Sequence, residues 1–232
     1  MNVKRFLIGS IHMKAISTQL MGSPGIQETA PPPCVVVFGS PGAGKTTVAD
    51  TVVELMASEK DFMCLGLDLD ACVPQWMRDN FANGIYPTLK QREAFALDCC
   101  DFVDKQLLEK RNNGASKLAT IISFSFVNSD LRDVFRGRFP HAKWMLVDTS
   151  ENVATRRINM RQGHFYTGEK KGASKHEESP SDGATDDADN SEWKFAPVSF
   201  DHVVLDGTEA VETNAKRVLD VLRKAIVCAE NQ

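Results

Sequence analysis

The feature that most constrains the fold is a glycine-rich loop set between an apolar run and a helical pattern. Residues Cys34–Phe38 are apolar and rich in β-branched side chains, which is typical of a buried parallel strand. The motif Gly39-x-x-x-x-Gly44-Lys45-Thr46 follows directly, and an amphipathic helix is predicted over residues 46–58. Because a strand precedes this motif and a helix follows it, the motif predicts a phosphate-binding loop.

Each part of the loop has a chemical reason to be there. Glycines allow successive backbone N–H groups to point inward and form an anion-binding nest, and the start of the helix adds its positive dipole end. We expect Lys45 to bridge the β- and γ-phosphates and the Thr46 hydroxyl to ligate Mg²⁺, so ATP and Mg²⁺ are the predicted cofactors. The residues expected to contact the nucleotide are Gly39, Ser40, Pro41, Gly42, Ala43, Gly44, Lys45, Thr46 and Thr47.

Apolar runs that alternate with helical patterns predict an α/β fold. Strands are expected at residues 34–38, 62–67, 118–123, 144–147 and 203–205. Helices are expected at residues 46–58, 76–83, 88–112, 130–138, 151–161 and 209–229. This alternation predicts a three-layer αβα P-loop kinase fold with a five-stranded parallel sheet and a mobile lid. Ligands are expected at the carboxyl ends of the strands.

Two segments interrupt this pattern. Residues 1–33 are expected to be a flexible extension, although the lack of acidic residues in 1–27 leaves open a weak mitochondrial targeting signal or an upstream start codon. Residues 34–232 form the predicted kinase domain. Within it, residues 163–196 are expected to hold the lid and an acidic flexible insert, because residues 168–192 are acidic and almost free of apolar side chains.

Composition excludes several classes of function. The formal net charge of −4 gives no electrostatic reason to expect nucleic acid as a partner. No apolar run approaches the roughly 18 residues that a membrane span needs. The cysteines lack zinc-site spacing and predict free thiols in a reducing, cytoplasmic compartment; they are Cys34, Cys64, Cys72, Cys99, Cys100 and Cys228. A monomer or homodimer acting on a small molecule is expected.

Two carboxylates follow the second predicted strand. In an extended segment, the spacing of Asp68 and Asp70 puts both side chains on one face, at the cleft end of the strand. Asp68 is the predicted metal-side carboxylate, and Asp70 is predicted to orient or deprotonate an attacking hydroxyl. The alternative is a solvated acidic turn that ends the strand.

Basic and aromatic residues further along supply candidates for phosphate and acceptor contacts. Arg157 and Arg161 share a helix face before the predicted lid, where they would stabilise charge on the phosphoryl group in flight; the alternative is surface ion pairing. Arg132 is predicted to reach the acceptor or its phosphate, with a solvated helix face as the alternative. His164 and Trp76 are candidate acceptor contacts, although a surface histidine and a packing tryptophan are the ordinary interpretations.

Several of these spacings together resemble the gluconokinase family of small P-loop kinases, over about residues 35–222 without the acidic segment. The phosphate loop, the Asp68-x-Asp70 turn and the pattern Arg-x-x-x-Arg-x-x-His-Phe over residues 157–165 are similar to those of the family. Pro74, Gly84 and Arg92 also fit its pattern. The resemblance implies a fold like that of shikimate and nucleotide kinases, ATP-dependent phosphorylation of a hydroxyl, and an acceptor contact for Arg92.

The chain departs from the family where the acceptor would bind. The histidine that usually follows the Asp-x-Asp turn is Val73 here, and Met77 and Asn80 replace polar residues further on. A pocket that includes Val73, Met77 and Trp76 would be more apolar than one for gluconate. Gluconate is nevertheless the leading acceptor, with shikimate, another polyol or a nucleoside or nucleotide as alternatives. An acceptor-independent ATPase and a non-catalytic binding protein are the other interpretations.

Overall fold

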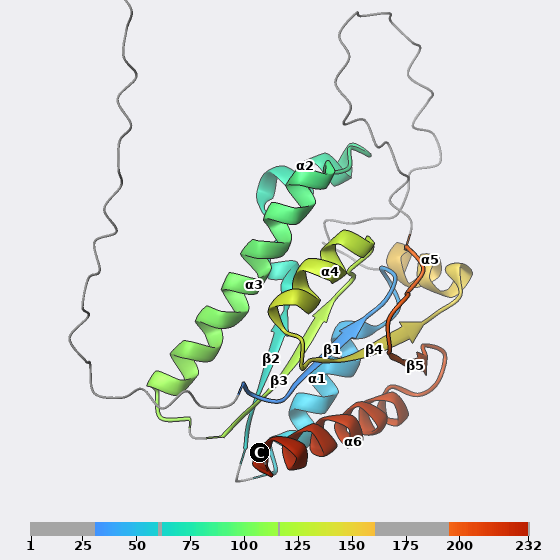
Figure 1. Ribbon diagram of the computed structural model, residues 1–232. Coiled ribbons are helices and arrows are strands. Elements are labelled where there is room, and N and C mark those ends of the chain that lie inside the picture. Colours follow the sequence, from blue (N-terminus) through green and yellow to red (C-terminus); the bar gives the residue numbers. More distant parts are fainter. Residues whose placement is uncertain (1–30, 60–61, 116, 161–194, 232) are drawn as a thin grey trace, which may run out of the picture. The chain divides into compact units, whose positions relative to one another are not determined.

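The computed structural model describes residues 31–59, 62–115, 117–160 and 195–231, in which strands and helices alternate along the chain (Figure 1). The elements are β1 (Cys34–Phe38), α1 (Lys45–Met56), β2 (Met63–Asp68), η1, a short 3₁₀ helix (Leu69–Cys72), α2 (Gln75–Ala82), α3 (Leu89–Asn112), β3 (Leu118–Phe124), α4 (Ser129–Arg138), β4 (Lys143–Asp148), α5 (Glu151–Met160), β5 (Val203–Asp206) and α6 (Val211–Glu230).

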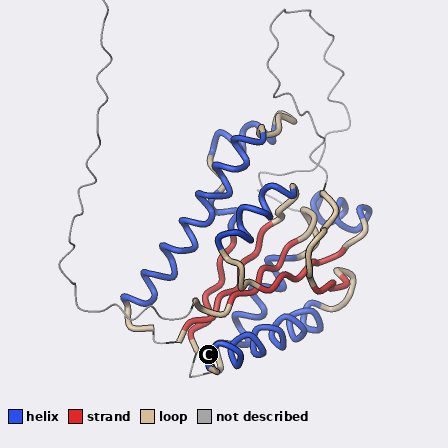
Figure 2. The backbone as a smooth tube through the Cα atoms, in the orientation of Figure 1, coloured by secondary structure: helices blue, strands red, loops and turns tan. Residues whose placement is uncertain are grey.

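In the described part of the chain, five strands form one parallel sheet in the order β2-β3-β1-β4-β5. Figure 2 shows these strands side by side, with helices on either side. The register aligns their carboxyl ends, because Phe38 pairs with Phe124 of β3 and Leu146 of β4, and Asp68 pairs with Ser123. The loops that follow the strands therefore leave from one edge of the sheet, which is where an α/β fold places its ligands.

The central strand β1 separates two hydrophobic clusters. Val35 and Val37 pack on one face with residues of α1 and α6, whereas Val36 and Phe38 pack on the other face with residues of α3 and α4. All four side chains are fully buried, which explains why β1 is a continuous apolar run. The predicted five-stranded parallel sheet between helical layers is thus confirmed.

The face covered by α3 and α4 is rich in aromatic side chains. The Phe126 ring lies 5.0 Å from that of Phe135 and 5.2 Å from that of Trp144, and Phe38 lies 5.2 Å from Trp144 in an edge-on arrangement. Edge-to-face pairs at this separation add stabilisation beyond the burial of area. Phe126 belongs to the loop that follows β3 and Phe135 belongs to α4, so these contacts hold the loop against that helix.

Two expectations need correction. The chain after Asp68 is not extended: it enters η1, because the Asp68 carboxylate accepts a hydrogen bond from the Asp70 backbone N–H at 3.0 Å. The expected apolar acceptor pocket is also wrong for two of its three residues, since Val73 and Met77 are buried in the core under α3. Most of the expected extension and most of the expected lid and acidic insert lie outside the described residues.

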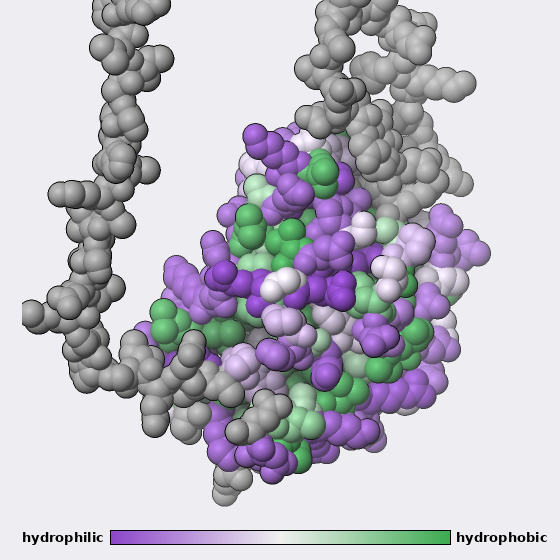
Figure 3. All heavy atoms as spheres, viewed as in Figure 1, coloured by the Kyte–Doolittle hydropathy of each residue, from purple (hydrophilic) through white to green (hydrophobic). Residues whose placement is uncertain are grey.

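The surface that remains is mixed. On the face in Figure 3, small groups of apolar residues are separated by polar ones. Among the described residues, every helix is too short or too polar to span a lipid bilayer.

The aromatic cluster generates a stability prediction. Replacing Phe135 by Ala leaves a cavity among buried rings, and we expect it to lower the free energy of unfolding by about 3–5 kcal/mol. Leu108→Ala, at an exposed position of α3, is the matched control and should change it by less than about 0.5 kcal/mol. Urea unfolding followed by circular dichroism measures both; equal effects would contradict the assigned core.

Candidate active site

The loop between β1 and α1 is shaped by backbone atoms that approach each other closely. Gly39, Gly42 and Gly44 all have positive φ angles, of 148°, 82° and 103°. A Cβ on Gly39 would lie 2.5 Å from the Val147 carbonyl oxygen of β4, and one on Gly42 would lie 2.5 Å from the Ala154 carbonyl oxygen of α5. Glycine is therefore required at both positions, because any side chain would displace the loop from the strand or from the helix.

The loop ends at the start of α1 in an environment suited to an anion. Gly44 is the N-cap of α1, with no side-chain cap, and the first turn of the helix holds no acidic residue. The Lys45 ammonium donates to the Ser40 carbonyl oxygen at 2.9 Å and so lies across the loop. The backbone N–H groups of a helix start together with a lysine form a site for the oxygens of a polyphosphate.

A hydroxyl and a carboxylate meet beside this loop. The Thr46 hydroxyl donates to Asp68 Oδ2 at 3.0 Å, which joins the first turn of α1 to the end of β2. Burial raises the pKa of Asp68 above its ordinary value, and the nearby charge of Asp70 raises it too, whereas the hydrogen bonds from Asp70 N–H and Thr46 and the charge of Lys45 lower it. Burial outweighs the hydrogen bonds, so the charged form of Asp68 is less favourable than that of an exposed aspartate.

The donor set fits Mg²⁺ that arrives with phosphates. In the residues that the structure describes, no group of three His, Cys, Asp or Glu side chains is placed to hold a metal ion. Mg²⁺ is usually held by one or two protein oxygens together with substrate phosphates and water, and the oxygens of Thr46 and Asp68 match that requirement. The structure places the Thr46 hydroxyl and the Asp68 carboxylate in contact, with Asp70 in the 3₁₀ turn that follows; their roles as metal ligands stay a prediction.

Arg78 was not singled out from the sequence, but it fixes the turn that carries these carboxylates. Its Nε donates to the Val73 carbonyl oxygen and its Nη2 to the Asp70 carbonyl oxygen, both at 2.8 Å. An arginine on a short amphipathic helix gives no signal of this kind in the sequence, because its acceptors are backbone atoms of η1 and the residue after it.

Arg157 links two loops at the other side of the phosphate loop. Its Nη1 donates to the Ala43 carbonyl oxygen at 3.0 Å, and its Nη2 donates to the Gly207 carbonyl oxygen, after β5, at 2.9 Å. Gly207 packs so tightly on Asp148 and Thr149 that it has no room for a Cβ. These loops border a cavity of about 280 Å³, lined among others by Gly44, Thr47, Arg157, Gly207 and Asn214.

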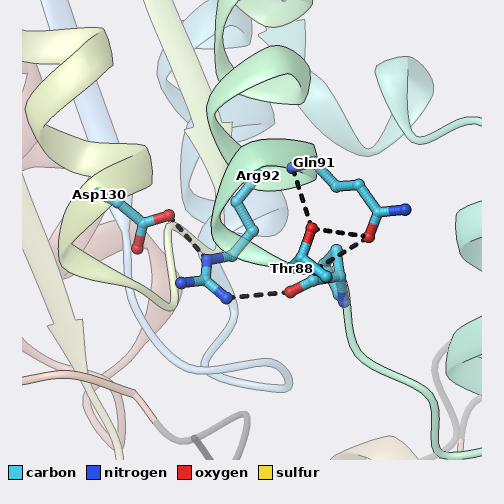
Figure 4. A network of polar contacts seen from close by, with 5 residues as sticks. Thr88, Gln91, Arg92 and Asp130 are labelled. Atoms are coloured by element: carbon cyan, nitrogen blue, oxygen red, sulfur yellow. Dashed lines mark hydrogen bonds and ion pairs between the residues drawn. The ribbon is translucent and has the colours of Figure 1, made fainter. Parts of the chain in front are cut away.

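Arg92 and Arg132, both predicted to contact the acceptor, are buried and bound to protein groups. Arg92 is 6% exposed, and its Nε lies 2.7 Å from Asp130 Oδ2 while its Nη1 donates to the Pro87 carbonyl oxygen at 2.9 Å. Figure 4 shows this guanidinium between α4 and the capped start of α3, where Thr88 and Gln91 bond each other. Arg92 therefore ties α3 to α4 across a buried ion pair.

Arg132 is more deeply buried, at 1% exposed. Its guanidinium donates to the carbonyl oxygens of Phe126, Val127, Ala196 and Pro197 at 2.7–3.1 Å and lies 4.4 Å from the centre of the Phe195 ring. In this arrangement the side chain fixes two loops and has no face open to a ligand, which corrects the expected acceptor contact and also the expected solvated helix face. Burial lowers its pKa to about 10, so it stays charged at neutral pH.

The other candidates are spread out. Trp76 lies on α2 and is 44% exposed. Arg161 and His164 lie outside the described residues. The structure thus brings together the phosphate loop, Asp68, Asp70 and Arg157 at the carboxyl edge of the sheet.

Comparisons with solved structures agree with this architecture. The chain is similar to a sugar kinase from Janibacter sp. HTCC2649, with 24% identity, TM-score 0.59, and 85% of this chain and 98% of that one covered. It is also similar to the Mycobacterium tuberculosis APS kinase CysC in complex with AMPPNP and APS, with 16% identity, TM-score 0.56, and coverage of 83% and 99%. A gluconokinase from Sinorhizobium meliloti 1021 gives 18% identity, TM-score 0.51, and coverage of 86% and 95%.

At identities this low, the structural similarity shows the fold alone, and the chemistry must be argued from the residues of the site. No family model matches the chain, and no curated protein matches it. The chain has the three-layer fold of these P-loop kinases.

The raised pKa of Asp68 generates a prediction about pH. The native state binds the proton of Asp68 more tightly than the unfolded chain does, so ionisation of Asp68 lowers the stability of the fold. This loss is complete at a pH above the pKa of Asp68 in the folded state. It is absent at a pH below its pKa in the unfolded chain. Asp68→Asn should therefore raise the melting temperature at neutral pH, and the gain should vanish as the pH falls to the range where an ordinary aspartate protonates. Asp148→Asn, at the exposed end of β4, is the control. Calorimetry from pH 3 to 8 measures the melting temperature of both variants. An increase in melting temperature by Asp68→Asn that became larger in acid would contradict the prediction.

Proposed function

We propose that this protein transfers the γ-phosphoryl group of ATP to a hydroxyl group of a small molecule. The observation that carries the proposal is the meeting of the glycine nest, the Thr46–Asp68 pair and Asp70 at the carboxyl edge of the sheet. Each group would serve one need of phosphoryl transfer: the nest would bind the phosphates, the pair would offer oxygens to Mg²⁺, and Asp70 would orient or deprotonate the acceptor hydroxyl.

The residues divide the work by position. Lys45 would leave the Ser40 carbonyl oxygen and contact the β- and γ-phosphates, where its charge stabilises the group in flight. When bound, Mg²⁺ supplies charge neutralisation between those phosphates. Asp70 would orient the acceptor hydroxyl or take its proton, and Arg157 and Arg161 would stabilise the charge on the transferring phosphoryl group.

The cavity beside Arg157 is suited to the nucleoside end of ATP. It adjoins Gly44 and Thr47 beside the phosphate loop and has a volume of about 280 Å³. Its lining includes the apolar side chains of Val48 and Val211. A nucleotide whose phosphates lie in the nest would extend in this direction, which leaves the opposite side, toward η1 and α2, for the acceptor.

Gluconate is the leading candidate for the acceptor. The family resemblance of the sequence and the similarity in fold to a gluconokinase and a sugar kinase both favour a polyhydroxylated acceptor. Trp76 on α2 is 44% exposed and so remains accessible to an acceptor, whereas Arg92 ties α3 to α4 through Asp130. His164 remains a proposed contact.

The phosphate site predicts the effect of removing Lys45. Lys45→Met should lower the rate constant of phosphoryl transfer by about 100- to 1,000-fold, because one preorganised charge on the transition state is lost. Lys216→Met, at an exposed position of α6, is the matched control and should keep full activity. Transfer of ³²P from labelled ATP to the acceptor measures both; unchanged transfer by Lys45→Met would overturn the site assignment, provided its circular dichroism spectrum is native.

The acceptor is found by measuring ATP consumption with Mg²⁺, first alone and then with gluconate, other polyols, shikimate and nucleosides in turn. We expect slow hydrolysis alone and strong stimulation by gluconate. Stimulation by a different compound alone would support the proposed phosphoryl transfer but would identify that compound, in place of gluconate, as the acceptor. Rapid turnover without any acceptor would instead identify an ATPase and contradict the proposal.

A further inference from the structure

Two cysteines meet directly beside the proposed active-site turn. Cys72 is the last residue of η1, two positions after Asp70, and Cys99 lies on α3 at 2% exposed. Cys72 packs against the buried cluster that contains Cys99, η1 packs on α3, and the two thiols shift each other's pKa. All six cysteines are free thiols, so this pair is reduced in the structure.

The two thiols differ in the way that a reactive pair requires. Cys72 is partly exposed, whereas Cys99 is buried behind it. The hydrogen bond from Cys99 lowers the pKa of Cys72 and outweighs burial and the charges of Asp98 and Asp68, while the same bond and burial raise the pKa of Cys99. An accessible sulfur with more thiolate character reacts first with an oxidant, and a neighbouring thiol can then resolve it.

We propose that Cys72 and Cys99 are a peroxide-sensitive pair whose oxidation to a disulfide displaces the Asp68–Asp70 turn and slows catalysis. The part of this proposal that concerns catalysis rests on the proposed kinase function. The formation of the disulfide does not, since it follows from the placement of the thiols alone.

The chemistry balances with hydrogen peroxide as the oxidant. The Cys72 thiolate attacks one peroxide oxygen, the O–O bond breaks, and Cys72 becomes a sulfenic acid while hydroxide leaves and takes up the proton that the thiol released. The Cys99 thiol then attacks that sulfur, the S–O bond breaks, and water leaves with the Cys99 proton. Two thiols and one peroxide give one disulfide and two waters.

The disulfide would move the turn rather than the helix. Non-bonded heavy atoms rest about 3.5–4.0 Å apart, and a disulfide bond is about 2.05 Å long, so the sulfurs must approach by more than about 1 Å. Cys99 belongs to the long helix α3 and is surrounded by core residues, whereas Cys72 ends a four-residue 3₁₀ turn. The shift should therefore move η1. Asp68 caps the start of η1 and accepts a hydrogen bond from the Asp70 N–H within it, so both aspartates would move with this turn.

A displacement of this size matters at an active site. A misplacement of about 1 Å can cost about 100-fold in rate when a reacting group must be aligned. The Thr46 hydroxyl donates to the other oxygen of Asp68, so the same shift would also weaken Mg²⁺-dependent binding of ATP. This second consequence can be measured without an acceptor.

The test treats the full-length protein with hydrogen peroxide and reads three quantities: the mass of the non-reduced protein and of its peptides, the affinity for ATP with and without Mg²⁺, and the rate of phosphoryl transfer. We expect a mass loss of two hydrogen atoms located in a Cys72–Cys99 peptide pair. Transfer should fall about tenfold or more, and Mg²⁺-dependent binding should weaken, with both restored by dithiothreitol.

Variants separate this pair from other thiols. Cys72→Ser and Cys99→Ser should each abolish the cross-link and keep their activity in peroxide, whereas Cys228→Ser, at an exposed thiol on α6, should respond like the unmodified protein. Oxidation of other cysteines without a Cys72–Cys99 cross-link would overturn the pair. A cross-link that leaves both transfer and Mg²⁺-dependent binding unchanged would overturn its coupling to the turn.

The failure of the kinase assignment is distinguishable from these outcomes. If the reduced protein transfers no phosphoryl group to any acceptor, the proposed function fails, but the cross-link and the change in Mg²⁺-dependent binding still decide the redox proposal. If the reduced protein does not bind ATP either, the coupling to catalysis fails with the function, and the mass measurement alone decides whether the pair forms.

Discussion

The parallel pairing of β1 between β3 and β4 is the constraint on which the site depends. Because β1 is buried on both faces and paired on both edges, its end point is fixed, and the glycine loop must leave from the middle of the sheet. The loop then touches the backbone of β4 at Gly39 and the backbone of α5 at Gly42. A phosphate nest built from backbone N–H groups keeps its shape only if the backbone around it is held in this way.

Much of this arrangement could be predicted from the sequence, because it rests on patterns that are local. In the part of the chain that the structure describes, the apolar run of β1, the loop motif and the helical periodicities place each strand and each α-helix to within a few residues of its observed bounds. The turn after Asp68 was predicted wrongly, since the Asp68 side chain competes for the Asp70 backbone N–H and bends the chain into a 3₁₀ turn. A side chain that bonds its own backbone overrides the extended pattern of the strand before it.

The roles of the arginines could not be predicted from spacing. Arg132 and Arg92 resemble ligand contacts in the sequence, because arginine binds phosphates well, whereas Arg78 gives no signal there. In the structure, each donates to backbone carbonyl oxygens that lie in other elements or turns. Every residue type has a backbone carbonyl oxygen, so the sequence does not show which residues accept these hydrogen bonds. Only the fold reveals whether an arginine binds a ligand or the chain itself. Val73 and Met77 present the same problem for apolar residues, which serve a pocket and a core equally well.

The anchoring by Arg132 has a consequence for which residue can stand at this position. Arg132 donates to the carbonyl oxygens of Phe126 and Val127, in the loop after β3, and to those of Ala196 and Pro197, which lie far along the chain. One buried guanidinium thus serves four acceptors from two segments. A lysine has three donors on a single nitrogen, so it could not reproduce this arrangement although it carries the same charge.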